Sequence, residues 1–213
     1  LPLYVNKQKC SISRAFLFYK HIRNIIPMMK LKNILIILIC SAFFACDSGV
    51  NTDEVLKSLK SGEGKILIKI DGKEYYPKES IFKGELTVLE GFFRTSLFDQ
   101  FESNVVIAFG GDKWYANKPI KKQVFIDNQV AASVMIGKLI NKEKQLGEGF
   151  LMTEGEITVM SLSEEKFVMR FDGKLGKYDV QREPEKWNIV EGWIIIKNPK
   201  ITLQGLKSEE VYF

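Results

Sequence analysis

From Gly64 onward, apolar and polar residues alternate with a period of two along most of the chain. In Lys65–Ile70 the isoleucines share one face of an extended segment and the lysines share the other, as in a half-buried β-strand. Gly, Asp, Asn and Pro residues interrupt this alternation roughly every 8 to 12 residues, which is the spacing of turns between short strands. The alternation is therefore the feature that most restricts the fold, because a strand period cannot be accommodated in a helix.

We expect strands in these segments: 65–70, 80–89, 92–98, 103–109, 156–162, 166–171, 188–197 and 201–206. Asp71-Gly72 is a strong hairpin signal, and Asp172-Gly173 also reads as a turn after an apolar strand. Val130–Ile140 fits a long strand or a short helix, whereas 188–197 is apolar on both faces, as a central strand is. We expect one all-β domain at 63–213: a single antiparallel β-sandwich or lipocalin-like barrel of about nine to eleven strands.

The segment Met28–Cys46 has the organisation of an export signal. Two lysines precede an apolar run from Ile34 to Phe44, and this run is shorter than the roughly 20 residues of a membrane span. Phe43-Phe44-Ala45-Cys46 resembles a bacterial lipobox, with Phe43 in place of the usual leucine. This resemblance implies cleavage between Ala45 and Cys46 and lipidation of Cys46. The alternatives are an ordinary cleaved signal peptide and an uncleaved anchor.

Residues before and after this segment complete the expected organisation. We interpret 1–27 as an upstream extension and 28–45 as the signal peptide, so neither belongs to the mature protein. Residues 46–62 then form the lipidated cysteine and a short tether. Within the tether, Asn51 followed by Glu54 is typical of a helix N-cap, and Gly62 would end the helix.

Removal of residues 1–45 changes the composition of the chain. All seven Lys and Arg residues of that segment are lost, which leaves 24 basic against 26 acidic residues and a net charge of −2. We therefore expect no nucleic-acid partner, because such binding needs a clustered excess of cations. His21, Cys10 and Cys40 are lost too, and a lipidated Cys46 carries no free thiol. This excludes Ser-His-Asp and Cys-His catalysis and Zn sites built from His or Cys, and we expect neither a metal nor a cofactor.

Few polar pairs remain as candidates for chemistry. Glu154 and Glu156 are spaced to share one face of a strand, as a glycosidase carboxylate pair would need, but the neighbouring Gly155 favours a solvated turn. Exposed aromatic residues are the better signal, since neighbours on a strand point to opposite faces. Tyr76, Trp114 and Tyr115 are therefore candidate ligand contacts. The alternative is that one member of each aromatic pair packs in the core while the other covers a sheet edge or the second sheet. We expect Trp187 and Trp193 as core residues.

The whole chain resembles small lipoproteins of the Bacteroidota, which combine a lipobox, a short tether and a β domain of unknown function. The residues behind this resemblance are the lipobox, the segment Gly64–Tyr75 and Val190–Trp193. It implies a lipid-anchored protein of the bacterial cell envelope. We expect the outer membrane rather than the inner, although an Asp after the cysteine, here Asp47, retains lipoproteins at the inner membrane in some bacteria. Without catalytic residues, we expect a binding module for a glycan, lipid or protein partner. The alternatives are a carboxylate-based hydrolase of envelope polysaccharide and a structural assembly subunit that pairs through an open sheet edge.

Overall fold

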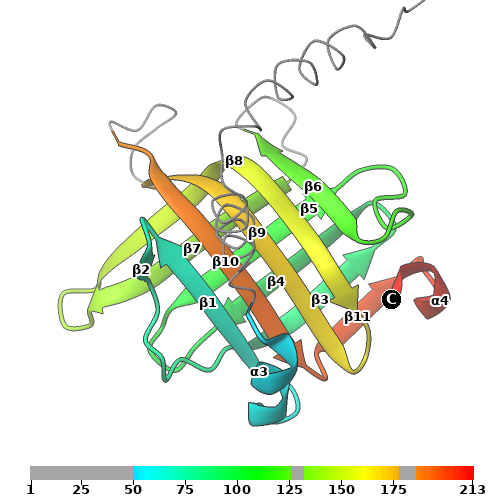
Figure 1. The fold of residues 1–213 in the computed structure, drawn as a ribbon, viewed down its shortest axis with the longest axis horizontal. Coiled ribbons are helices and arrows are strands. Elements are labelled where there is room, and N and C mark those ends of the chain that lie inside the picture. The colour runs from blue at the N-terminus through cyan, green and yellow to red at the C-terminus, as the bar shows by residue number, and fades with distance from the viewer. Residues whose placement is uncertain (1–49, 126–131, 178–185) are drawn as a thin grey trace, which may run out of the picture. The chain divides into compact units, whose positions relative to one another are not determined.

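The structure is a computed structural model that describes residues 50–125, 132–177 and 186–213 (Figure 1). Cys46 and the segments 1–27 and 28–45, which we expect to be an upstream extension and a signal peptide, lie outside the described residues. Within these ranges the all-β prediction is confirmed. The chain forms eleven strands there: β1 (Gly64–Ile70), β2 (Lys73–Glu74), β3 (Lys83–Leu89), β4 (Phe92–Phe98), β5 (Asn104–Gly110), β6 (Ile120–Phe125), β7 (Ala132–Asn141), β8 (Leu146–Leu162), β9 (Lys166–Lys177), β10 (Asn188–Lys197) and β11 (Lys200–Gln204). Two short helices, α3 (Thr52–Ser58) and α4 (Ser208–Val211), flank them.

All eleven strands belong to one sheet. Its order is β11-β3-β4-β5-β7-β8-β9-β10-β1-β2, and β6 pairs with β8 beside this path. Each neighbouring pair is antiparallel except β11 and β3, which run parallel, so the sheet is mixed rather than purely antiparallel. Only Asn198 and Pro199 separate β10 from β11, yet β11 pairs with β3, at the other end of the strand order, and not with β10.

The sheet folds over on itself. Figure 1 shows β6, β8, β9, β10 and β1 in the nearer layer, with β3, β4, β5 and β7 behind them. Near the two edges, the backbones of Gly64 and Phe82 exchange hydrogen bonds of 2.7 and 2.8 Å, which form an isolated bridge. The sheet is not closed into a barrel, so the sandwich-like architecture is the one that the structure supports.

Inward-facing side chains of both layers form the core. The ring of Phe93 on β4 stacks on that of Phe167 on β9, with centroids 5.6 Å apart and planes 21° apart. Phe93 also stacks on Phe109 of β5 at 4.6 Å. Burial alternates along β5 and β7, as the period of two predicts. Contacts between aromatic rings from different layers therefore hold the folded sheet together.

β8 is a single strand of 17 residues, and it changes partner midway. Its first part pairs with β7 and its second part with β6, while β9 pairs with it from Phe150 to Leu162. At the change, Gly155 (φ 145°) lies opposite Gly173 (φ 159°). Our turn prediction at Asp172-Gly173 is therefore wrong: two facing glycines bend both strands without ending them.

Other local predictions have mixed outcomes. Asp71-Gly72 forms the expected hairpin turn, with positive φ at both residues. In the segment Val130–Ile140, which fitted a strand or a helix, residues 132–140 are part of strand β7. Residues 130 and 131 lie outside the described residues. Trp187 is 43 % exposed, so its assignment to the core is wrong, and Trp193 is half-buried.

The expected N-cap is present at α3. Asn51 Oδ1 accepts a hydrogen bond from the Glu54 amide at 3.2 Å. The segment after α3 packs on the domain: Leu59 is 4 % exposed, and Lys197 Nζ on β10 donates to its carbonyl oxygen at 2.9 Å. The helix is therefore held on the β domain at the end of β10.

Candidate binding groove

The aromatic residues proposed as ligand contacts do not form an exposed platform. Tyr76 is 6 % exposed, and its hydroxyl donates to the Asn104 carbonyl at 2.7 Å. Trp114 is 3 % exposed, and its Nε1 donates to the Leu89 carbonyl at 2.9 Å. Tyr115 is half-buried, with its ring edge-on to Trp114 at 5.5 Å. The prediction of accessible stacking surfaces is therefore wrong for Tyr76 and Trp114, whose polar atoms have partners inside the domain.

The reason lies in local backbone conformation. Tyr75 and Tyr76 follow the end of β2, and Trp114-Tyr115 lies in a turn. Neighbours point to opposite faces only within a strand, so the alternation rule does not apply to either pair. Burial also raises the pKa of the Tyr75 and Tyr76 hydroxyls well above the ordinary tyrosine value.

Glu154 and Glu156 share the outer face of β8, as their spacing predicts, but each forms an ion pair with a different lysine. Glu154 pairs with Lys174 at 2.8 Å, and Glu156 pairs with Lys121 at 3.3 Å. Gly155 between them lies inside the long strand, not in a turn. The two carboxylates therefore belong to exposed ion pairs.

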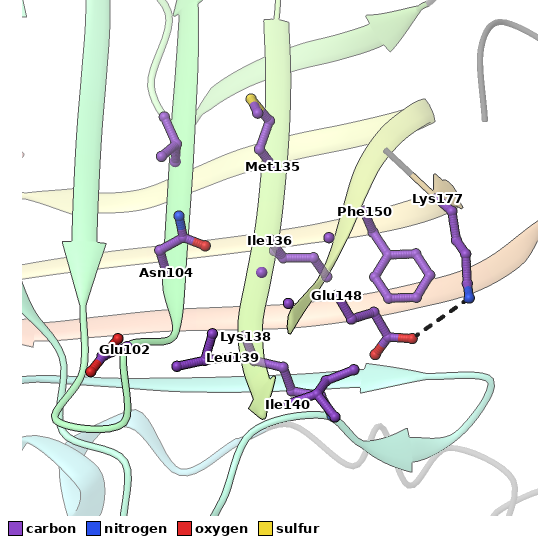
Figure 2. A pocket seen from close by; sticks show the side chains of 14 residues that line it. Glu102, Asn104, Met135, Ile136, Lys138, Leu139, Ile140, Glu148, Phe150 and Lys177 are labelled. Atoms are coloured by element: carbon purple, nitrogen blue, oxygen red, sulfur yellow. Dashed lines mark ion pairs between the residues drawn. The ribbon is translucent and has the colours of Figure 1, made fainter. Parts of the chain in front are cut away.

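A groove of about 590 Å³ lies where β5, β7 and the start of β8 adjoin (Figure 2). Its volume falls within the roughly 300–1,000 Å³ that is usual for small-molecule sites. Figure 2 shows Asn104 on β5, Met135 to Ile140 along β7, Glu148 and Phe150 on β8, and Lys177 at the end of β9. None of these residues was singled out from the sequence.

The register of β7 and β8 explains why the surface is hollow here. Gly137 pairs with Gly149, and Leu139 pairs with Gly147, so three positions of one ladder lack side chains. The neighbours of Gly137 in sequence, Ile136 and Lys138, point to the other face of the strand. Half-buried Met135, Leu139 and Val106 flank the bare backbone. The groove therefore has apolar walls and a floor of peptide groups.

Charged groups around the groove balance one another. Glu148 lies 4.0 Å from Lys177, and Glu102 lies 2.5 Å from Lys142. Lys138 Nζ donates to the Tyr75 carbonyl at 3.3 Å and sits 4.2 Å from the centroid of the Tyr75 ring. The lining contains two glutamates and two lysines, so their charges cancel. Lys138 and Glu148 are paired across the β7–β8 ladder and project from the face opposite to Gly137 and Gly149, at the border of the groove.

Asn104 supplies the remaining polar side chain. Its Oδ1 lies only 2.5 Å from the position that a Cβ on Gly137 would occupy, so the amide lies over the groove floor. Within the part of the chain that the structure describes, its NH₂ group donates no hydrogen bond. The groove therefore offers an amide donor to an acceptor on a ligand.

Two further findings limit the chemistry of the described ranges. They contain no group of three or more His, Cys, Asp or Glu side chains placed to hold a metal ion. They also contain no helix with the length and hydrophobicity needed to span a membrane.

The chain matches no protein-family model, no curated protein and no solved structure.

The sequence contained only a partial signal for the groove. Gly137, Gly147 and Gly149 are visible, but isolated glycines within strands are common at bends and bulges. Their importance depends on the register that places Gly137 opposite Gly149. The ambiguity of the segment Val130–Ile140 prevented that register from being assigned.

Proposed function

We propose that this protein is a lipid-anchored cell-envelope lipoprotein whose β domain binds a neutral glycan in the β5–β7–β8 groove. The lipobox resemblance at Phe43–Cys46 supports the anchor. The observation that carries the binding proposal is a groove of suitable volume with apolar walls, no net charge and an available amide donor. A floor without side chains lets one face of a sugar ring approach the backbone closely, and Asn104 can donate to a ring substituent.

Filling the groove tests the binding site. A Cβ at Gly147 makes only ordinary contact, 3.4 Å from the Lys138 carbonyl oxygen, so Gly147→Leu can enter the groove without a backbone clash. Gly91→Leu is the matched control, since nothing lies within 4 Å of its Cβ position. On an array of immobilised neutral oligosaccharides, we expect Gly147→Leu to weaken binding about tenfold or more and the control to bind normally.

The donor is tested separately. Asn104→Ala leaves the backbone carbonyl that accepts from Tyr76 in place, so the fold is retained. We expect it to weaken glycan binding by about threefold to tenfold, the equivalent of one hydrogen bond. Equal binding by wild type and Gly147→Leu would contradict the groove assignment. Binding only to lipids or proteins would change the ligand class, and hydrolysis of a polysaccharide would favour the rival enzyme.

The anchor has its own test. Cells expressing the full chain or its Cys46→Ser variant are labelled with a fatty-acid analogue. We expect label in the wild type alone, with a mature N-terminus at Cys46. One acyl chain binds membranes only marginally, whereas two or more hold stably, so the variant should also be released from the membrane fraction.

A further inference from the structure

The described β domain begins next to the lipidation site of our proposed function, and this inference rests on that proposal. Only Asp47, Ser48 and Gly49 separate Cys46 from Val50, the first described residue. Four fully extended peptide steps span at most about 14 Å. The start of the β domain therefore cannot lie far from the headgroups of the membrane that holds Cys46.

The chain enters the β domain at one defined end. Leu59, just after α3, is buried, and Lys197 at the end of β10 contacts it. The backbone of Lys197 also accepts from Gly62 at 2.8 Å and donates to Glu63 at 3.0 Å. These bonds hold the chain on the β domain from Leu59 onward. α3 precedes this attachment and has no buried residue, although Val55 and Leu56 on it are half-buried.

The groove lies at the opposite end of the sheet, and β9 connects the two places. At its start, Lys166 pairs with Lys197, beside the α3 attachment. At its end, Lys177 pairs with Phe150 and lines the groove. Eleven strand steps correspond to roughly 36 Å if straight, and somewhat less with the bend at Gly173.

The turns at the groove end carry both charged and apolar side chains. The β4–β5 turn carries Asp99 and Glu102, and the β7–β8 turn carries Lys142, Glu143 and Lys144. Exposed Phe98, Phe101, Ile140 and Leu146 lie in or beside the same turns. The composition of these turns therefore does not decide the orientation, which follows from the place where the chain enters the domain.

We infer that α3 and the adjoining ends of β9 and β10 lie against the membrane surface, while the groove is held away from it. A ligand then reaches the groove from the aqueous side. This placement agrees with a glycan as ligand and disfavours a lipid of the same bilayer.

Site-specific fluorescence quenching tests this orientation. After lipidation of Cys46 the mature chain has no other cysteine, so an introduced cysteine can be labelled alone. Exposed Ser58 on α3 and exposed Lys144 in the β7–β8 turn are replaced by cysteine and labelled. The full-length lipoprotein is reconstituted in vesicles of phosphatidylethanolamine and phosphatidylglycerol that contain a headgroup-nitroxide lipid as quencher.

We expect the Ser58 label to lose most of its fluorescence and the Lys144 label to lose little. Lys57→Cys, on the same helix, provides a second proximal position if Ser58→Cys folds poorly. Inserting a Gly/Ser linker of about 20 residues after Gly49, with a mean span of roughly 25 Å, should reduce quenching at Ser58. Equal quenching at both labels, or stronger quenching at Lys144, would overturn the orientation.

The intact mass of the same samples separates the two proposals. A mass that lacks the acyl groups, or a fluorophore attached to Cys46, means that the anchor itself is absent. A correctly acylated protein with equal quenching means that the anchor is right and the orientation is wrong.

Discussion

Gly155 and Gly173 allow β8 and β9 to bend together, and this predicts a large effect of a single methyl group. A Cβ on Gly155 would overlap the Asp172 carbonyl oxygen and would lie only 2.7 Å from the Gly173 Cα. Its φ of 145° is also unfavourable for any residue with a side chain. We expect the backbone strain to cost about 1–2 kcal/mol and the overlap about 1–3 kcal/mol. Gly155→Ala should therefore lose about 2–5 kcal/mol of a total stability of about 5–15 kcal/mol.

Three other glycines separate the two contributions. Gly91 has neither a positive φ nor a close neighbour, Gly72 has a positive φ (75°) in open space, and Gly84 has only the clash, with Ser96 and Leu97. Urea unfolding of a form beginning at Asp47, followed by circular dichroism, measures each Gly→Ala variant. We expect Gly91→Ala to be nearly neutral, Gly72→Ala and Gly84→Ala to be intermediate, and Gly155→Ala to be the least stable. A free energy of unfolding for Gly155→Ala within about 0.5 kcal/mol of Gly91→Ala would refute this account of the bend.

Two further predictions concern hydrogen bonds and ionisation. Hydrogen bonds from the Ile189 amide and the Asn188 side chain lower the pKa of the Asp71 carboxyl, so its contribution to stability is present above its ordinary pKa and is lost as the pH falls through the lowered one. Acid unfolding should therefore destabilise wild type more than Asp71→Asn, and equal slopes would contradict this. Tyr76→Phe should cost about 1 kcal/mol in urea unfolding, because the part-buried carbonyl oxygens of Asn104 and Gly137 lose the hydrogen bonds that the buried Tyr76 hydroxyl donates. Because burial raises the pKa of Tyr75 and Tyr76, the unfolded chain releases their protons first, and stability should fall above about pH 10. Ultraviolet titration should then show these two tyrosines ionising only on unfolding.

The repeated tripeptide Asp-Gly-Lys shows which parts of the fold the sequence could predict. At Asp71 it forms the hairpin turn that its composition predicts, since both central residues adopt positive φ. At Asp172 the same residues continue β9, because Gly173 lies opposite Gly155 on β8. The deciding contact is non-local, so no property of the tripeptide itself distinguishes the two cases.

The same limitation applies to the candidate sites. Alternation predicted most strands because each is half-buried, and that pattern is local. Tyr76 and Trp114 lie outside strands, where alternation says nothing about direction. The groove depends on the pairing of Gly137 with Gly149, which is a property of two strands together.

The charged outer face of β8, β9 and β10 bears on the choice between binding and hydrolysis. Three carboxylates lie directly opposite one another on these strands: Glu156, Asp172 and Glu191. Like charges in such positions are destabilising unless cations offset them. Each carboxylate has a cation nearby: Lys121 lies 3.3 Å from Glu156, Arg170 lies 3.7 Å from Asp172, and Lys69 lies 3.1 Å from Glu191. A carboxylate hydrolase needs one acid that stays protonated beside one that is ionised, in a site sheltered from water. Asp172 and Glu191 line a shallow hollow of about 490 Å³ on this face, and each lies beside its own cation. This arrangement is suited to a solvated surface of ion pairs, and it favours binding in the β5–β7–β8 groove over hydrolysis at the carboxylates.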